Sequence, residues 1–118
     1  MGKTVLVVDD SRFMRAVVRN ECERNGCTVV AEADCSDAAV QKYKEFKPDI
    51  VTMDITMPGV DGIESLKLIK KNNPDAKVVM ITAAGQKEKM LEAVKYGAVE
   101  FVAKPFVEET VIDALSKC

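Results

Sequence analysis

The segment "VLVVDDSRFM", residues Val5–Met14, joins an apolar run to a pair of charges. Its first four residues are aliphatic, and they are followed at once by the carboxylates of Asp9 and Asp10. A run that is apolar on both sides is typical of a parallel strand that helices cover on both faces. Two like charges at the end of such a strand need a physical reason, because they repel each other and are costly to desolvate.

The composition predicts one small domain over residues 1–118. With 118 residues, of which 47% are hydrophobic, the chain has enough apolar surface for one core and little for a second. Lys and Arg number 17 against 19 acidic residues, so no basic field attracts nucleic acid. No apolar run approaches the roughly 20 residues of a membrane span, and "MGKTVLVVDD" lacks the pattern of a signal peptide. We therefore expect a cytoplasmic protein without nucleic-acid or membrane partners.

Cysteine and histidine usage restricts the chemistry further. The four cysteines form no C-x-x-C pair, and the chain contains no His, so we expect free thiols rather than disulfides or a zinc site; they are Cys22, Cys27, Cys35 and Cys118. The lack of imidazole also excludes Ser-His-Asp and Cys-His catalysis. Any chemistry must come from carboxylates, hydroxyls and lysines.

Short apolar runs alternate with amphipathic segments along the whole chain. The runs predict five strands: Thr4–Val8, Thr28–Ala33, Asp49–Met53, Lys77–Thr82 and Glu100–Ala103. Between and after them, apolar residues recur at helical spacing over 14–22, 39–46, 63–69, 90–94 and 111–115. Ser11 and Ser36 are predicted N-caps, and Gly26 and Gly97 predicted helix ends. Five such units with right-handed crossovers predict an α/β fold, a doubly wound five-stranded parallel sheet with five helices on both faces.

In doubly wound sheets, ligands bind outside the carboxyl ends of the strands. The polar residues that follow the predicted strands there are Asp9, Asp10, Asp34, Asp54, Thr82 and Lys104. The flavodoxin-like strand order 2-1-3-4-5 would place the first and third strands side by side, so that Asp9, Asp10 and Asp54 converge. Three carboxylates in one partly desolvated cleft predict a site for a hard divalent cation with oxygen ligands.

A simpler interpretation is that Asp9 and Asp10 form a turn and an N-terminal charge for the helix after Ser11. For the two residues alone this interpretation is the better one. The joint pattern favours the site instead, since Asp54, Thr82 and Lys104 are expected at the same edge of the sheet.

Four motifs in this order carry a family resemblance: "VLVVDDS", "PDIVTMDITMPGVDG", "VVMITA" and "GAVEFVAKPF". Over essentially its whole length the chain resembles the receiver domain of two-component response regulators. Within that family it is most similar to the stand-alone chemotaxis response regulators. That closer similarity rests on "DDSRFMR", "PDIVTMDITMP" and the "AGQ" of residues 84–86.

The resemblance implies a phosphoryl acceptor and a magnesium site. Asp54 corresponds to the acceptor, Asp10 and Asp54 to direct Mg²⁺ ligands, and Asp9 to a ligand acting through water. The backbone carbonyl of Thr56 corresponds to the remaining protein ligand. Physical chemistry agrees, because a carboxylate attacks phosphorus effectively once the charge of the phosphoryl oxygens is neutralised.

The resemblance also implies a switch. Lys104 corresponds to the lysine that pairs with the phosphoryl oxygens, Thr82 to the hydroxyl that follows the phosphate, and Phe101 to the switch aromatic. Many relatives have Tyr at the position of Phe101, so here the ring reports the state by packing and not through a hydroxyl. Taken singly, Lys104 is better explained as a surface charge and Thr82 as an ordinary strand residue. Their expected placement beside Asp54 favours the functional roles instead.

The function implied is a signalling switch and not an enzyme, although it assists its own phosphorylation and slow dephosphorylation. A histidine kinase donates to Asp54, and the altered face of helix 4, strand 5 and helix 5 binds a partner, which in chemotaxis is the flagellar motor switch. We expect a monomer that signals by protein contact. Alternatives within the family are a phosphorelay shuttle and the excised receiver of a larger regulator.

Two other classes share parts of the pattern. Haloacid-dehalogenase-like phosphotransferases also place a nucleophilic Asp after a parallel strand, but they carry a second Asp two residues on, where this chain has Thr56. Flavin-binding electron carriers share the topology, yet Asp9 and Asp10 would repel a flavin phosphate. Both are therefore weaker hypotheses than the receiver switch.

Overall fold

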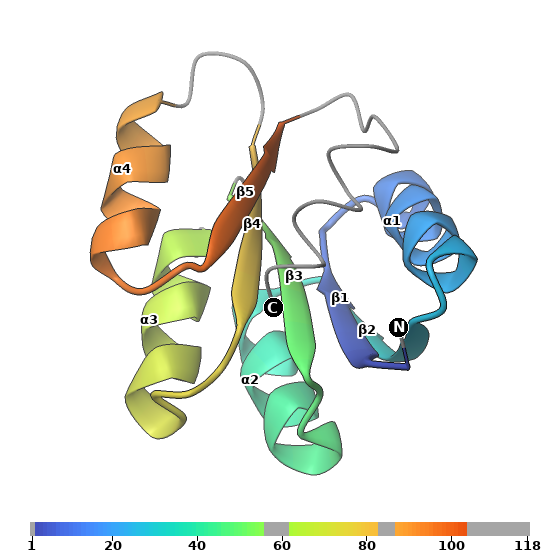
Figure 1. The fold of residues 1–118 in the computed structure, drawn as a ribbon. Coiled ribbons are helices and arrows are strands. Elements are labelled where there is room, and N and C mark those ends of the chain that lie inside the picture. The colour runs from blue at the N-terminus through green and yellow to red at the C-terminus, as the bar shows by residue number, and fades with distance from the viewer. Residues whose placement is uncertain (1, 56–61, 83–86, 104–118) are drawn as a thin grey trace.

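The computed structural model of the protein describes residues 2–55, 62–82 and 87–103, with the backbone alone described at 82, 87, 101 and 103. Strands and helices alternate along this part of the chain (Figure 1). The elements are β1 (Thr4–Val8), α1 (Arg12–Arg24), β2 (Thr28–Ala33), α2 (Ser36–Phe46), β3 (Ile50–Asp54), α3 (Gly62–Asn72), β4 (Val78–Thr82), α4 (Lys87–Lys95) and β5 (Glu100–Ala103).

The five strands form one parallel sheet in the order β2-β1-β3-β4-β5, as predicted. Each strand lies within one residue of its predicted position at either end. The predicted fifth helix, around residues 111–115, lies outside the described residues. The order places β1 beside β3, so that the residues following these two strands lie at the same edge of the sheet.

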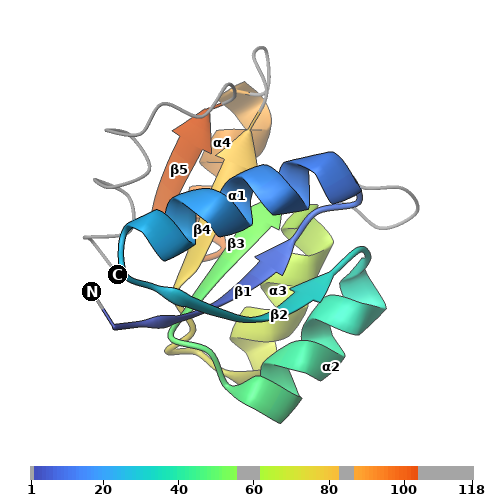
Figure 2. The same cartoon turned by 90° about the vertical axis from the view of Figure 1, so that its right-hand side faces the viewer.

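Alternate residues of each strand enter two apolar layers, because successive side chains of a strand point to opposite faces. On one face, Val5 and Val7 of β1 pack with Val18 and Cys22 of α1. On the other face, Leu6 and Val8 join the core that α2, α3 and α4 cover. Figures 1 and 2 show the same division, with α1 alone on its side of the sheet among the described helices.

Helix ends follow local backbone chemistry. Ser11 caps α1 as predicted, since its Oγ accepts a hydrogen bond of 3.2 Å from the Met14 N–H. Gly26 and Gly97 lie at helix ends with φ of 80° and 99°, the left-handed conformation that glycine adopts most readily. The prediction for Ser36 is wrong: Cys35 occupies the N-cap position with extended backbone, and Ser36 is the first helical residue.

Three of the four cysteines are described, and all three are free thiols: Cys22, Cys27 and Cys35. Burial raises the pKa of the Cys22 thiol to about 12, and the neighbouring Cys27 adds to the rise. A thiol with such a pKa is a poor nucleophile at neutral pH, so Cys22 serves packing. Cys118 lies outside the described residues. No helix in the described ranges has the length and apolar character needed to cross a membrane.

Candidate functional site

Three carboxylates meet at the carboxyl edge of the sheet. Asp9 and Asp10 follow β1, and Asp54 is the last residue of the neighbouring β3. One oxygen of each carboxylate lies within 4.8 Å of the other two. Asp9 and Asp54 are 1% and 4% exposed, whereas Asp10 is open to solvent. The predicted convergence of these residues is confirmed, and it follows from the strand order.

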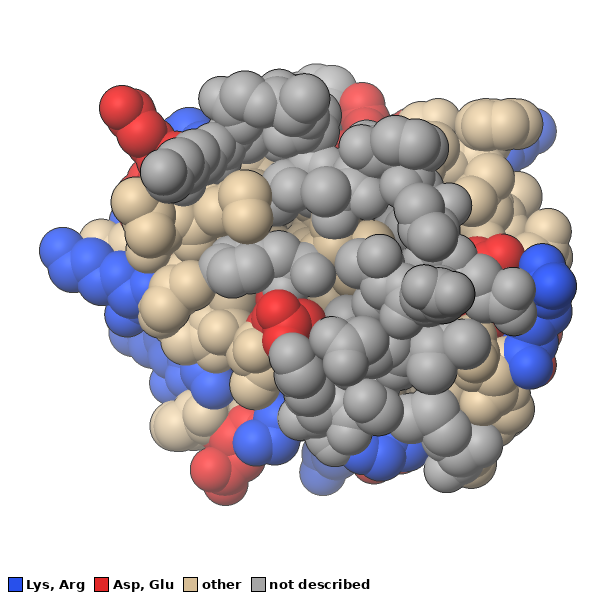
Figure 3. All heavy atoms as spheres, turned by 45° about the horizontal axis from the view of Figure 1, so that its top comes forward, with Lys and Arg blue, Asp and Glu red and all other residues tan. Residues whose placement is uncertain are grey.

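Figure 3 looks onto this edge of the molecule. A small group of acidic atoms is visible in the interior of the face, whereas Lys and Arg side chains lie mainly at its periphery. Among the described residues, three carboxylates therefore gather where the ends of β1 and β3 meet.

The loop after β1 is held by hydrogen bonds at Asp9. Its N–H donates to the carbonyl of Ala33 in β2 at 3.0 Å. Its Oδ1 accepts from the Ser11 N–H at 2.9 Å, and its carbonyl accepts from the Arg15 guanidinium at 2.7 Å. The main chain on which two of the three carboxylates lie is thus fixed from both β2 and α1.

The end of β3 is fixed by a close contact with α3. The Gly62 N–H donates to the carbonyl of Ile55 at 2.7 Å. A Cβ added to Gly62 would lie 2.0 Å from the Asp54 carbonyl oxygen and 2.8 Å from the Ile55 Cα. Only glycine allows this approach, which places the start of α3 against the backbone of Asp54.

The other predicted site residues are only partly described. The backbone of Thr82 ends β4, next to β3, and Phe101 lies on the adjacent β5. The two residues are therefore on neighbouring strands, as predicted, with Thr82 paired to Ala103 in register. The side chains of Thr82 and Phe101, and all of Thr56 and Lys104, lie outside the described residues.

Arg15, Glu32 and Gly62 were missed by the sequence analysis. Gly62 ends the quoted motif "PDIVTMDITMPGVDG" and lies eight positions after Asp54, so a glycine opening a helix was the available signal. Arg15 and Glu32 are 17 residues apart and meet only because α1 crosses β2. No local pattern in the sequence indicates that pairing.

The donor set fits a magnesium ion. Every potential ligand atom in the cluster is a carboxylate oxygen, the donor type that Mg²⁺ prefers, and the cluster lacks the nitrogen and sulfur donors that favour zinc. Burying Asp9 and Asp54 together is unfavourable unless positive charge compensates them. A divalent cation held by Asp9, Asp10 and Asp54 would relieve this repulsion.

Comparisons with known proteins indicate the family of the chain. The family model for the response regulator receiver domain matches residues 5–116. A chemotaxis protein CheY from Thermotoga maritima is 49% identical over 117 residues, which cover 99% of this chain and 98% of that protein. A chemotaxis protein CheY from Bacillus subtilis is 45% identical over the same length and the same shares.

Solved structures show the same fold. The CheX-CheY-BeF3-Mg complex from Borrelia burgdorferi contains a chain that matches with a TM-score of 0.90 and 35% identity, covering 96% of this chain and 86% of that one. The receiver domain of NtrX from Brucella abortus matches with a TM-score of 0.90 and 32% identity, covering 96% and 95%. Since the family model spans nearly the whole sequence, the chain belongs to the response regulator receiver domain family.

Proposed function

We propose that this protein is a phosphorylation-activated switch of a two-component system, in which Asp54 accepts a phosphoryl group. The observation that carries the proposal is the meeting of Asp9, Asp10 and Asp54, whose oxygens lie within 4.8 Å of one another, in a chain of the receiver family. The relatives named chemotaxis protein CheY support a role in chemotaxis.

The transfer needs little from the protein beyond position and charge. A carboxylate oxygen of Asp54 attacks the phosphorus of a phosphohistidine, the P–O bond forms, and the P–N bond breaks with its electron pair going to the imidazole nitrogen. Because the Asp54 carboxylate attacks in its ionised form, no general base is required. When bound, Mg²⁺ neutralises charge on the phosphoryl oxygens, and Asp9, Asp10 and Asp54 are the described residues that would hold it.

Residues beyond the described ranges complete the proposal. From the resemblance, the Thr56 carbonyl joins the metal ligands and Lys104 pairs with the phosphoryl oxygens. The Thr82 hydroxyl follows the phosphate, and the ring of Phe101 repacks in response. A fifth helix near the C-terminus would then form the partner-binding face together with α4 and β5.

We further propose that residues 1–118 form one receiver domain that acts in the cytoplasm as a monomer. Its phosphodonor is a histidine kinase, and its partner is a downstream protein such as the flagellar motor switch. The protein is a switch that assists its own phosphorylation and slow dephosphorylation, and it turns over no separate substrate. A phosphorelay shuttle or a receiver excised from a larger regulator is the alternative, and binding to purified motor-switch protein distinguishes these outputs.

Incubation with a small phosphodonor and Mg²⁺ tests the acceptor. Mass spectrometry should find one acid-stable, base-labile phosphoryl adduct on Asp54, which is lost in Asp54→Asn and after chelation of the metal. Asp34→Asn is the matched control, because Asp34 is an exposed carboxylate that follows β2 at the same edge. An adduct on Asp9, Asp10 or a serine would show that the nucleophile is misassigned.

A further inference from the structure

Two arginines on one face of α1 share a carboxylate on β2. The Arg15 Nε lies 3.1 Å from the Glu32 Oε1, and the Arg19 NH1 lies 2.5 Å from the Oε2. Arg15 and Arg19 are four residues apart, so they lie on the same side of the helix. Each oxygen of Glu32 thus accepts from one guanidinium.

The two arginines differ in what else they contact. The Arg15 NH1 donates to the backbone carbonyl of Asp9 at 2.7 Å, and the Arg15 side chain is only 16% exposed. Arg19 is 42% exposed, and its Nε instead lies 3.7 Å from Glu23 on the same helix. Arg15 therefore links the sheet to the acidic loop, whereas Arg19 lies at the surface.

Strand β2 holds both backbone polar groups of Asp9, its N–H and its carbonyl. Its N–H donates directly to Ala33, and its carbonyl is reached through Arg15, which Glu32 holds in place. Glu32 and Ala33 are adjacent residues of β2. The Asp9 carbonyl and the Asp10 N–H belong to one planar peptide unit, so fixing that carbonyl also fixes the direction in which the chain reaches Asp10.

We propose that Arg15 is a positioning residue for the metal site, and that Glu32 acts as its anchor. Arg15 acts through the Asp9 carbonyl, to which it donates. It keeps the Asp9–Asp10 peptide in the orientation that brings both carboxylates toward Asp54. The hydrogen bond is charge-assisted and partly buried, and such bonds are stronger than those between neutral groups. This role rests on the proposed function, since it presupposes that the cluster binds Mg²⁺.

The test compares Mg²⁺ affinity in Arg15→Gln and Arg19→Gln by titration calorimetry on the full chain. Both variants lose one positive charge from α1 and one partner of Glu32, but only Arg15→Gln loses the contact with Asp9. Partners that orient metal ligands typically contribute about 10- to 100-fold in affinity. We expect Arg15→Gln to bind Mg²⁺ about tenfold more weakly, and Arg19→Gln to stay within about twofold of the parent because exposed charges are screened.

Two further variants separate position from charge. Arg15→Lys keeps the charge but lacks the planar fork that meets Asp9 and Glu32 together, so its affinity should stay well below that of the parent. Glu32→Gln keeps both arginines but weakens the anchor, and it should lower affinity by less than Arg15→Gln. Full recovery of Mg²⁺ affinity in Arg15→Lys would show that Arg15 acts through its charge, and would overturn the positioning role.

Metal-free measurements distinguish this role from a general loss of stability. In the presence of EDTA, amide NMR shifts of residues 9–11 should change in Arg15→Gln and not in Arg19→Gln. Equal Mg²⁺ affinities in the two variants would overturn the inference while leaving the magnesium site intact. If the parent itself bound no Mg²⁺, the proposed function would fail, and the role of Arg15 with it.

Discussion

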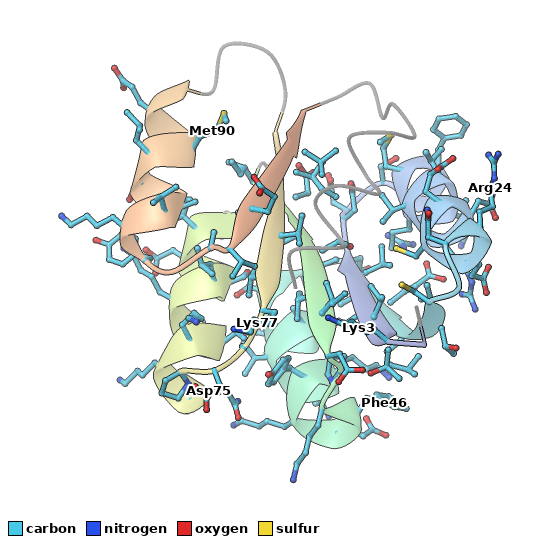
Figure 4. The ribbon with its side chains drawn as sticks, viewed as in Figure 1. Lys3, Arg24, Phe46, Asp75, Lys77 and Met90 are labelled. Carbon is cyan, nitrogen blue, oxygen red and sulfur yellow. The ribbon has the colours of Figure 1, made fainter. Side chains whose placement is uncertain are left out.

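Within the described residues, the two edges of the sheet differ in how their charged side chains are arranged. At the carboxyl edge, three carboxylates of the same sign lie together, and two of them are buried. At the amino edge, a hollow of about 410 Å³ is lined by residues of both signs: Lys3, Tyr43, Pro48, Asp49, Asp75 and Lys77. Figure 4 shows Lys3, Asp75 and Lys77 at this lower end of the sheet.

Asp49 shows how the amino edge satisfies its charge within the chain. Its Oδ2 accepts from the Thr4 N–H at 2.8 Å and from the Thr4 hydroxyl at 3.2 Å, while its own N–H donates to that hydroxyl at 3.0 Å. These bonds join the start of β1 to the start of β3. An Asp beside a strand is thus not a functional signal by itself. The carboxyl edge differs because it gathers three carboxylates, with one oxygen of each within 4.8 Å of the other two.

The largest effect that we predict is at Gly62, whose close contact with the Asp54 backbone lies at the carboxyl edge. Gly62→Ala places a methyl group against backbone atoms that have no flexible end to move away, so we expect a loss of about 3 kcal/mol in the free energy of unfolding. Displacement of Asp54 should weaken Mg²⁺ binding in the same variant. Denaturant unfolding and calorimetric titration measure the two effects.

Gly97→Ala is the control for Gly62→Ala. Gly97 has a φ of 99°, and its added Cβ would meet the flexible end of Lys70 at 2.8 Å. The Gly97→Ala variant should lose about 1–2 kcal/mol in the free energy of unfolding, because alanine disfavours the left-handed backbone, and its Mg²⁺ binding should be unchanged. Unchanged stability in Gly62→Ala would mean that α3 does not constrain the end of β3.

The next effect is at the amino edge. Asp49→Ala removes the acceptor for two groups of Thr4, and we expect a loss of about 1–2 kcal/mol in unfolding free energy, reduced from the usual range by exposure. Asp75→Ala is the matched control, because the Asp75 carboxylate makes no hydrogen bond or ion pair with the described residues, and it should change stability by no more than about 0.5 kcal/mol. Neither variant should change Mg²⁺ affinity. Equal losses of unfolding free energy in Asp49→Ala and Asp75→Ala would show that the hydrogen bonds of Asp49 with Thr4 do not stabilise the fold.

Neutralising a carboxylate at the carboxyl edge should stabilise the metal-free protein, whereas the substitutions above destabilise it. Asp10→Asn relieves repulsion among the three carboxylates, so the metal-free protein should become slightly more stable. At ten times the dissociation constant, Mg²⁺ should stabilise the parent by about 1.4 kcal/mol, several degrees in Tm, and Asp10→Asn far less. Circular dichroism or calorimetry must be used, since the chain has no Trp. An equal Tm gain in Asp10→Asn would contradict the metal site, and Asp34→Asn controls for the lost charge.

The sequence was sufficient to predict the sheet and the acidic cluster, for related physical reasons. Strands buried on both faces leave continuous apolar runs such as Val5–Val8, and parallel strands bring their carboxyl ends to one edge. Those two facts bring Asp9, Asp10 and Asp54 together without knowledge of any side-chain contact.

Features that depend on exact packing could not be predicted. The contact of Gly62 with Asp54 depends on the height at which α3 begins beside β3. The contact of Arg15 with Asp9 depends on side-chain reach between a helix and a loop. The prediction of Ser36 as the N-cap of α2 was one residue off, because the extended backbone at Cys35 lets the helix begin at Ser36 itself.

The smallest effect that we predict concerns Tyr43, and it measures how weakly like charges interact at the amino edge. Burial raises the pKa of the Tyr43 hydroxyl above its ordinary value of 10.0, and the nearby Asp75 carboxylate raises it further. A raised pKa means that the neutral phenol is favoured in the folded state, so its contribution to stability is present below pH 10 and is lost as the pH rises above that value.

Asp75→Asn should lower the Tyr43 pKa only part of the way toward its ordinary value, since burial is the larger cause of the rise and remains in the variant. Phenolate absorbance in a Tyr96→Phe background, where Tyr43 is the one tyrosine of the sequence, follows the titration. Asp37→Asn, an equal charge change at an exposed position in the first turn of α2, is the control. If both substitutions shift the Tyr43 pKa equally, the Asp75 carboxylate has no specific effect on Tyr43 in the hollow.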